Sequence, residues 1–262
     1  MHLPRFPEKF NDEPLFRADA FLAYLEKVGV ALSHRPAPDG VIISYQKSLF
    51  DHVVDTYPTE RARGYFGNVL HYVEVPECRR TLAIAAGFGI GAPAAAVLAE
   101  ELIAWGTQSF VSMGFAGSLQ QDLPPGALVV CDGAFRDEGT SSHYLKDEAI
   151  ARPDPLLTAR LMRALDEAGL QYAVGPTWTT DAIYRETPVE IVGYREMGAL
   201  VVEMEAAALF AVASYRGAAI ASCFSVSDTL AELSWRPEFH SEPSVQGLER
   251  LFACAARALD QD

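Results

Sequence analysis

Short apolar segments alternate with longer segments of helical period along most of this chain, and no other feature of the sequence constrains its fold as strongly. Several of the short segments are continuously apolar, which is typical of strands that are covered on both faces. Strands that alternate with helices form a mostly parallel sheet with helices packed against it. The sequence therefore predicts an α/β fold with a central, mostly parallel sheet.

The same pattern assigns residues to the elements. Helices are expected over Phe16–Val28, Ala92–Trp105, Pro155–Ala168, Glu205–Tyr215 and Val245–Leu259. Strands are expected over Val41–Ser44, Val69–Val75, Leu82–Ala86, Ser109–Met113, Ala127–Cys131, Ala199–Val202 and Ala219–Val226. No internal repeat or long linker interrupts the chain, so residues 1–262 are expected to form one domain. Residues 1–35 form an N-terminal extension to which no motif assigns a role.

Composition narrows the class of protein. Half of the 262 residues are apolar, which excludes disorder, collagen and coiled coil. The formal net charge of −14 disfavours nucleic acid and anionic membranes as partners. No signal peptide or apolar run of about 18 residues is present, so a cytoplasmic protein is expected. The widely spaced cysteines are expected to be buried thiols: Cys78, Cys131, Cys223 and Cys254.

Two glycine-rich segments follow predicted strands, where α/β sheets bind ligands. In Gly87-Phe88-Gly89-Ile90-Gly91-Ala92-Pro93 the glycines allow close backbone approach, and the helix start offers amides to an anion. The segment lacks the third glycine of a dinucleotide-binding loop. Two interpretations stay open, a loop that binds ligand oxygens and a simple turn between strand and helix. Ser112-Met113-Gly114-Phe115-Ala116-Gly117-Ser118 makes room for a flat ligand, although simple packing explains it equally well.

Two polar segments also follow strands. Residues 136–144 hold Arg136, two acids and a histidine, which suit either a substrate contact or a solvated loop. No metal is expected there, because further ligands would have to come from unmarked positions. Residues 177–187 begin with Trp178 and contain hydroxyls, an acid and Arg185, a set that can stack a base and bond its edge. A core tryptophan above a capped helix start is the alternative.

Two acidic motifs carry the sharpest functional signal. Val201-Val202-Glu203-Met204-Glu205 places two carboxylates between an apolar strand and an apolar helix, where burial without partners is costly. If the two glutamates lie on one face of a strand, both carboxylates could accept hydrogen bonds from the vicinal hydroxyls of a ribose. The alternative is that they are acids at the start of a helix, where the helix dipole favours negative charge. Asp228 ends the apolar run before it, and burial there would raise its pKa and suit a general acid. A helix N-cap is the alternative for Asp228.

In this order the segments resemble the nucleoside phosphorylase and nucleosidase superfamily, of the uridine phosphorylase and hexameric purine nucleoside phosphorylase type, over roughly residues 40–230. The most specific match is Val-Val-Glu-Met-Glu-Ala-Ala-Ala-Leu followed by a strand that ends in Ser-Asp. The resemblance implies a three-layer αβα sandwich with a mixed sheet and cleavage of the bond between base and ribose. It also implies no metal or organic cofactor, and a homo-oligomer (dimer, trimer or hexamer) whose neighbouring subunits complete the sites.

The resemblance also implies roles for single residues. Glu205 would accept hydrogen bonds from the ribose, Met204 would pack under the sugar, and Glu203 would lie near base or sugar. Asp228 would donate to the leaving base as the catalytic acid. The base-binding residues implied are Trp178, Ser227 and Arg185. Asp228 favours a purine base and Arg185 favours a pyrimidine base. The resemblance therefore does not decide which class of base the protein accepts.

The chain departs from the phosphorylase pattern where phosphate binds. Ser44-Tyr45-Gln46-Lys47-Ser48 replaces Gly-Asp-Pro-x-Arg, and Ser112 stands where a second arginine is usual. A phosphate or water pocket would use Gly87, Gly89, Ser112 and Gly114, with Arg61, Arg63, Arg136 or Lys47 as compensating cations. Phosphorolysis to free base and ribose 1-phosphate, with inorganic phosphate as co-substrate, is the expected activity. Hydrolysis with water and non-catalytic nucleoside binding are the alternatives.

Overall fold

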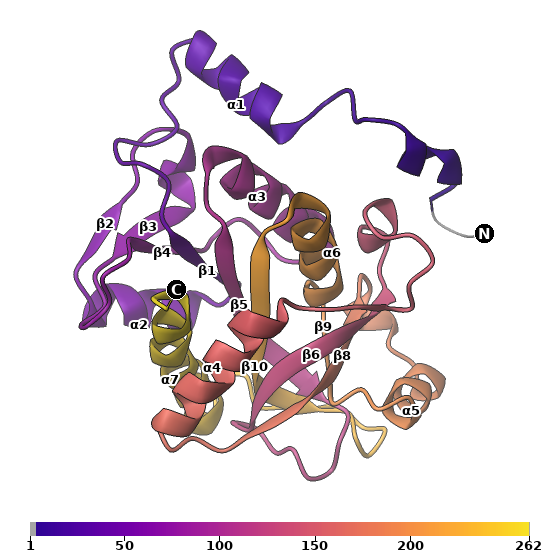
Figure 1. The fold of residues 1–262 in the computed structure, drawn as a ribbon. Helices are drawn as coiled ribbons and strands as arrows, with labels where there is room; N and C mark the ends of the chain where they lie inside the picture. The colour runs from indigo at the N-terminus through magenta and orange to yellow at the C-terminus, as the bar shows by residue number, and fades with distance from the viewer. Residues whose placement is uncertain (1–3, 262) are drawn as a thin grey trace.

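The computed structural model describes residues 4–261 and joins its strands into one eleven-stranded sheet (Figure 1). The strands are β1 (Gly40–Ser44), β2 (Thr59–Arg61), β3 (Leu70–Val73), β4 (Leu82–Ala85), β5 (Ser109–Ser118), β6 (Leu128–Asp137), β7 (Ile150–Ala151), β8 (Tyr172–Thr180), β9 (Val201–Glu203), β10 (Ala219–Thr229) and β11 (Arg236–Pro237). Their order is β11-β10-β6-β8-β9-β5-β1-β4-β3-β2, and β7 pairs with β6. The α/β class with a mixed sheet is confirmed.

Part of the sheet closes on itself. β5 pairs in parallel with β10 and antiparallel with β9, and β6 and β8 complete a circuit of five strands. The sequence predicts only an open sandwich. The closure depends on the second halves of β5 and β6, which run on to Ser118 and Asp137 through glycines that interrupt the apolar pattern. Pairing on both sides of these segments keeps them extended.

Residues 4–261 form seven α-helices, most of which pack on the sheet. They are α1 (Ala18–Lys27), α2 (Lys47–Thr56), α3 (Ala92–Trp105), α4 (Pro155–Glu167), α5 (Pro188–Glu196), α6 (Ala206–Arg216) and α7 (Glu242–Leu259) within residues 4–261. The five predicted helices are confirmed, and α2 and α5 were not predicted. The signal for α5 was present in the sequence, because Thr187 and Glu190 form a capping box around Pro188.

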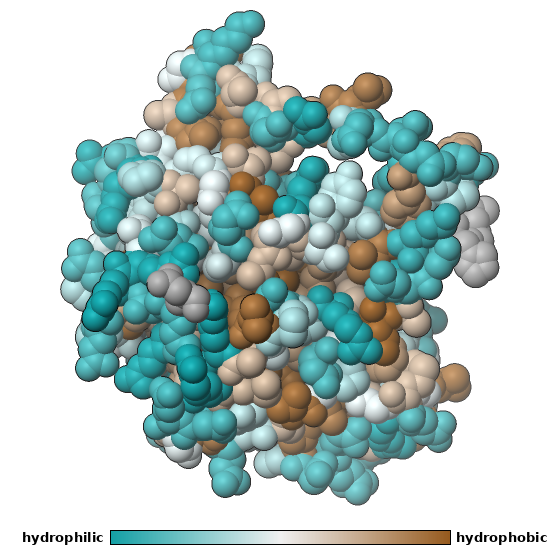
Figure 2. Space-filling view, viewed as in Figure 1, coloured by the Kyte–Doolittle hydropathy of each residue, from teal (hydrophilic) through white to brown (hydrophobic). Residues whose placement is uncertain are grey.

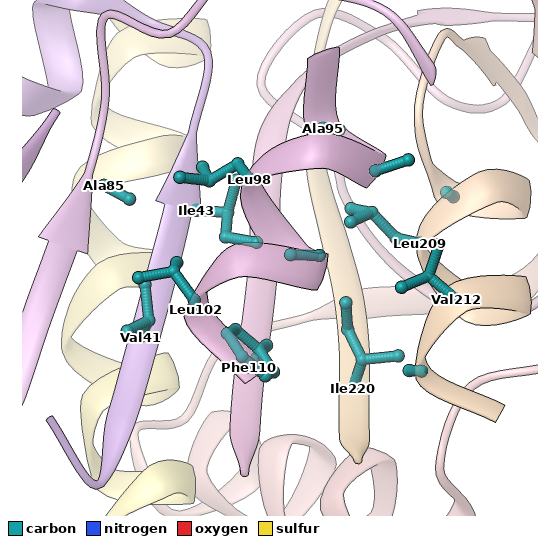
Figure 3. Packing of buried hydrophobic residues seen from close by; sticks show 14 of the residues in the cluster. Val41, Ile43, Ala85, Ala95, Leu98, Leu102, Phe110, Leu209, Val212 and Ile220 are labelled. Atoms are coloured by element: carbon teal, nitrogen blue, oxygen red, sulfur yellow. The ribbon is translucent and has the colours of Figure 1, made fainter. Parts of the chain in front are cut away.

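Helices on both faces give the three layers. α3 and α6 lie side by side on one face, where Leu102 and Leu209 pack against Phe110 of β5 and its neighbours (Figure 3). α4 and α7 cover the other face together with α2. Gly247 lets α7 approach β10 closely, because a Cβ at that position would lie 2.2 Å from Ser225 Oγ. The buried faces of both layers are apolar, so hydrophobic burial holds the sheet between them.

The N-terminal segment lies across the α3 side of the molecule. α1 packs against α3, and Phe21 of α1 makes an edge-on contact with Tyr65 at 5.8 Å between ring centroids. Figure 2 shows this segment passing over the body of the protein with an opening beneath it, and mostly hydrophilic side chains on the segment. None of the helices in residues 4–261 has the length and apolar character needed to span a bilayer. The four cysteines are free thiols, and burial is confirmed for Cys131, Cys223 and Cys254, whereas Cys78 is only partly buried and that part of the prediction is wrong.

Candidate active site

Two strands approach the same edge of β5 from opposite directions. β1 pairs along β5 as far as Met113, and β9 pairs with Gly117 and Ser118. The stretch 114–116 lies between these two pairings, so the chain that follows β1 and the chain that follows β9 meet there. Asp228 of β10 pairs with Gly117 from the other edge of β5. The strand register thus brings the acidic motifs and the second glycine-rich segment together.

Glu205 is held by the first glycine-rich segment. It is the N-cap residue of α6, only 6% exposed, and its Oε1 accepts a hydrogen bond of 2.6 Å from the backbone N–H of Gly91. Gly91 itself begins α3 with a φ of +91°, which favours glycine. The Met204 Cε lies 3.8 Å from the place a Cβ on Gly91 would take. The segments 87–93 and 203–205 therefore form one wall.

Glu203 has a different place from the one predicted. Its Oε2 accepts from the backbone N–H of Glu205 and Ala206, both at 2.7 Å, and its Oε1 accepts from the hydroxyl of Thr179. The carboxylate therefore caps α6 from within the protein. The two glutamates do not share a strand face, because Glu205 has already left the strand with φ −135° and ψ −31°. The prediction that the two glutamates lie on one strand face is therefore wrong, whereas the prediction that Glu203 lies near the base or sugar stays a prediction.

Burial raises the pKa of both glutamates, and repulsion from Glu203 raises the pKa of Glu205 further. The charge that acts on Glu205 is thus the negative charge of Glu203. A positively charged sugar would be stabilised at this wall.

Asp228 lies at a bulge in β10. The register shifts between Val226 and Asp228, and the intervening Ser227 donates from Oγ to Asp228 Oδ1 at 2.7 Å. Trp235 Nε1 donates to the other oxygen, Oδ2, at 2.9 Å. Burial raises the pKa of Asp228, and these two donors partly oppose that effect. Because Asp228 lies within a strand, the helix N-cap alternative is wrong.

Glycines 114 and 117 mark the two ends of the site. A Cβ on Gly117 would lie 3.2 Å from both Asp228 Oδ2 and Val202 Cγ1, and one on Gly114 would lie 3.0 Å from the ring of Tyr45. Three residues of strand span about 10 Å. Asp228 and Tyr45 are thus placed at opposite ends of a short stretch of β5.

Tyr45 is the residue that the sequence analysis noticed only as a departure. Its hydroxyl lies 2.9 Å from Ser112 Oγ, and its ring makes an edge contact with Phe88 at 5.6 Å between centroids. Burial and the charge of Glu205 raise the pKa of Tyr45 well above its ordinary value, so its phenol is neutral. Tyr45 and Ser112 are thus hydrogen-bonded to each other. Both lie at positions that the resemblance links to phosphate binding.

The predicted base-binding aromatic lies elsewhere. Trp178 is fully buried, stacks on Tyr194 at 4.5 Å and 16°, and donates from Nε1 to Asp137 at 2.9 Å. The prediction that Trp178 covers the base is wrong, and the core alternative holds. Arg185 lies on the exposed surface of the 3₁₀ turn Ile183–Arg185. It is Glu186 that lies near Asp228, and burial together with Asp228 raises the pKa of Glu186 to about 7.

The candidate cations are bonded to different parts of the chain. Arg136 holds the loop after β6, since it donates to Ser141 Oγ at 2.9 Å and to the carbonyls of Leu145 and Glu148, and its role in a phosphate pocket stays a prediction. Lys47 is exposed and bonded to Asp51 at 2.7 Å.

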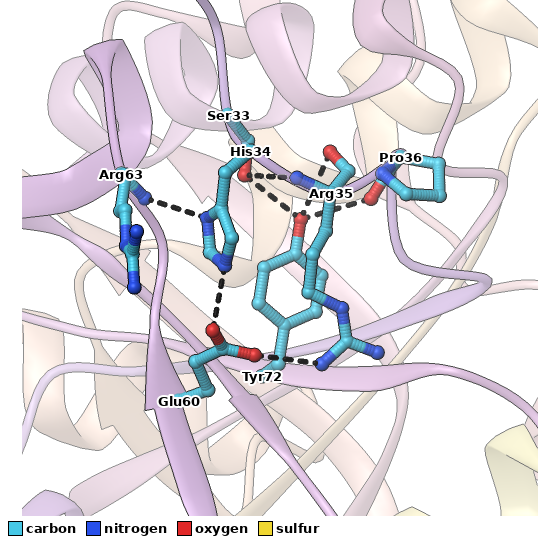
Figure 4. A network of polar contacts seen from close by, with 7 residues as sticks. All are labelled: Ser33, His34, Arg35, Pro36, Glu60, Arg63 and Tyr72. Atoms are coloured by element: carbon cyan, nitrogen blue, oxygen red, sulfur yellow. Dashed lines mark hydrogen bonds and ion pairs between the residues drawn. The ribbon is translucent and has the colours of Figure 1, made fainter.

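Arg61 and Arg63 lie on the β2 side. Arg61 donates to Asn68 Oδ1 at 2.8 Å, and the carbonyl of Asn68 lies 4.0 Å from the Cβ position of Gly87. Arg61 therefore borders the first glycine-rich segment. The backbone N–H of Arg63 donates to His34 Nδ1 at the rim of a network around Glu60 (Figure 4). The side chain of Arg63 is exposed there.

Three residues at the site were missed by sequence reasoning: Tyr45, Glu186 and Trp235. Tyr45 directly follows a predicted strand, which was a usable signal. Glu186 lies within the segment 177–187 that the sequence singles out, one residue after Arg185, whereas Trp235 lies in a loop with no motif, and only the fold brings the two residues to Asp228.

Comparisons with known proteins show the family of this chain. The family model described as the phosphorylase superfamily matches residues 56–260. Guanosine phosphorylase of Halorubrum lacusprofundi is 38% identical over 129 residues, which cover 49% of this chain and 54% of that protein. Uridine phosphorylase of Treponema pallidum is 35% identical over 139 residues, 49% of this chain and 54% of that protein. The chain thus spans about half the length of these relatives.

Two further comparisons extend the picture. The DeoD-type purine nucleoside phosphorylase of Shewanella denitrificans is 32% identical over 144 residues, 54% of this chain and 61% of that protein. The crystal structure of uridine phosphorylase from Vibrio fischeri superposes with a TM-score of 0.68 at 23% identity. That match covers 88% of this chain and 98% of the other, so the likeness of fold extends over nearly the whole domain.

Proposed function

This chain belongs to the phosphorylase superfamily, and we propose that it cleaves the N-glycosidic bond of a purine or pyrimidine nucleoside with phosphate, releasing free base and ribose 1-phosphate. The observation that carries the proposal is the convergence of Glu205 and Asp228 on one short stretch of β5. The names of the guanosine, uridine and purine nucleoside phosphorylases that match the chain support the same chemistry.

In the proposed reaction a phosphate oxygen bonds to the anomeric carbon while the bond from that carbon to the base nitrogen breaks. The bonding electrons leave with the base, and Asp228 supplies a proton or a hydrogen bond to the base. Its pKa, raised by burial, suits that role. The sugar gains positive charge as the bond breaks, and the buried carboxyl of Glu205 holds its hydroxyls and stabilises that charge.

Phosphate is the only co-substrate in this proposal, and no metal or organic cofactor takes part. The backbone N–H groups of the segment 87–90, just before α3, suit an anion, whereas the N–H of Gly91 is bonded to Glu205, and Arg61 borders the same segment. We further propose a homo-oligomer in which a neighbouring subunit completes each site. The free thiols support a reducing, cytoplasmic location.

The test is a panel of purine and pyrimidine nucleosides incubated with and without inorganic phosphate, with free base and ribose 1-phosphate measured by HPLC. We expect base release that requires phosphate, with ribose 1-phosphate formed in equal amount. Equal release in phosphate-free buffer would mean hydrolysis, and binding without release would mean a non-catalytic nucleoside binder. The preferred base follows from the same panel.

A further inference from the structure

The hydroxyl pair of Tyr45 and Ser112 has no role in the function proposed above. It lies at the end of the site marked by Gly114, whereas Asp228 lies at the end marked by Gly117. In a displacement at the anomeric carbon the nucleophile enters from the face opposite to the leaving group. If the base leaves toward Asp228, the nucleophile therefore enters on the Tyr45 side.

The pair can still bond a ligand. Two hydroxyls carry two hydrogens, and the bond between Tyr45 and Ser112 uses only one of them. Ser112 is 1% exposed, and Tyr45 is partly exposed as a residue although its hydroxyl is buried, so a ligand that accepts the free hydrogen must do so inside the protein rather than at its surface. The ring of Tyr45 can pack against β5 because residue 114 is a glycine, since a Cβ there would lie 3.0 Å from the ring.

The charges that act on Tyr45 are negative. Glu205 and Glu203 are the charged groups that act on Tyr45, and Lys47, two residues along the chain, is bonded to Asp51 at the surface. An oxyanion at this position would therefore meet neutral hydroxyl donors.

We propose that Tyr45, supported by Ser112, contacts the attacking phosphate oxygen and does with an uncharged hydrogen bond what a guanidinium would otherwise do. The assignment rests on the proposed phosphorolysis. Tyr45 touches the nucleophile, and Ser112 is a positioning residue that acts through Tyr45. The neutral contact gives weak phosphate binding, so the KM for phosphate is the quantity that this pair controls.

Steady-state kinetics of Tyr45→Phe and Ser112→Ala, with phosphate and nucleoside varied separately, test the assignment. We expect the KM for phosphate to rise about tenfold in Tyr45→Phe, which corresponds to about 1.4 kcal/mol, and less in Ser112→Ala. The KM for nucleoside should stay within about twofold. Tyr72→Phe is the matched control, because that hydroxyl donates to the Pro36 carbonyl at 2.8 Å on β3, away from the site.

An unchanged KM for phosphate in both variants, or a rise confined to the KM for nucleoside, would overturn the assignment while leaving phosphorolysis intact. If the wild-type protein shows no phosphorolysis, the proposed function fails separately. Calorimetric titration with inorganic phosphate alone then decides about Tyr45: binding that is weakened in Tyr45→Phe supports the contact, and equal binding or none refutes it.

Discussion

Asp228 is the residue on which the proposed chemistry depends most directly. Its carboxyl is buried and held by Ser227 and Trp235, one donor on each oxygen. A base nitrogen that bonds to it must share or replace one of these donors. Trp235 belongs to the loop after β10. Because its indole N–H is bonded to Asp228, we expect this loop to move when a nucleoside binds to Asp228.

Asp228→Asn should lower kcat by about a hundredfold to ten-thousandfold, the usual contribution of a general acid, because the amide cannot supply the proton. The KM for nucleoside should change little, since the shape of the side chain is kept. Asp132→Asn, at an exposed position of β6, is the control and should retain full activity. Unaltered turnover in Asp228→Asn would refute the proposed acid.

Glu186 makes stability depend on pH. Burial, then Asp228 and Glu190, raises its pKa from 4.5 to about 7, so the folded state keeps a proton that the unfolded chain loses. Stability from this group is present below pH 4.5 and is lost as pH rises toward 7. In Glu186→Gln, the gain in melting temperature over wild type should be larger at pH 8 than at pH 5. Glu196→Gln, at the exposed last residue of α5, should show no such difference.

At the scale of elements, two carboxylates at the start of α6 have different roles. Glu203 stabilises the helix, and Glu205 is proposed to bind the ligand. Glu203 accepts two backbone N–H groups of that helix start, whereas Glu205 accepts one from Gly91 and is repelled by Glu203. The two glutamates are separated only by Met204 in the motif, yet their removal should have different consequences.

Glu203→Ala should lower the free energy of unfolding by about 3 kcal/mol, because buried donors are left unpaired. Glu205→Ala should change it by less than about 1 kcal/mol, since the lost bond is offset by relief of the repulsion, but should raise the KM for nucleoside at least about tenfold. Urea denaturation and steady-state kinetics give both numbers. Equal destabilisation by the two substitutions would contradict this division of roles.

β5 provides the floor of the site through its glycines. Gly117→Ala places a methyl group 3.0 Å from Leu230 Cδ1 and 3.2 Å from Asp228 Oδ2. We expect the KM for nucleoside to rise about tenfold, about 1.4 kcal/mol of lost binding. Gly193→Ala in α5 is the control, because nothing lies within 4 Å of its new methyl group. Unaltered kinetics in Gly117→Ala would place the base elsewhere.

On the scale of the whole molecule, exposed apolar side chains on the N-terminal segment favour association. Leu15 is fully exposed and Phe16 is 78% exposed, in a chain whose net charge of −14 otherwise favours separation. Light scattering should give a mass that is a multiple of 28.5 kDa. Leu15→Asp with Phe16→Asp should weaken the association, while Tyr184→Asp, at another exposed position, should not. A mass of 28.5 kDa for the wild type would contradict the proposed homo-oligomer.

Many helices and strands of this fold could be predicted from the pattern of apolar, glycine and proline residues in short stretches of the sequence. The helix Ala92–Trp105 was predicted to the residue, since Gly91 and Pro93 mark its start and Gly106 its end. The strands before the acidic motifs were also predicted, because runs such as Ala219–Val226 are apolar on both faces. Where the pattern mixed glycine with polar residues, as in β8 and the second half of β5, the prediction failed.

The sequence by itself determined the α/β class, the buried acids of the two motifs and the family to which they belong. These features depend on residues close together in the chain, whose periodicity and chemistry are visible without coordinates. Only the tertiary structure decided that Glu203 caps α6, that Trp178 belongs to the core, and that Tyr45 lies at the site. Each of those outcomes depends on pairing and burial between segments far apart in the chain, and such contacts leave no periodic trace in the order of the residues.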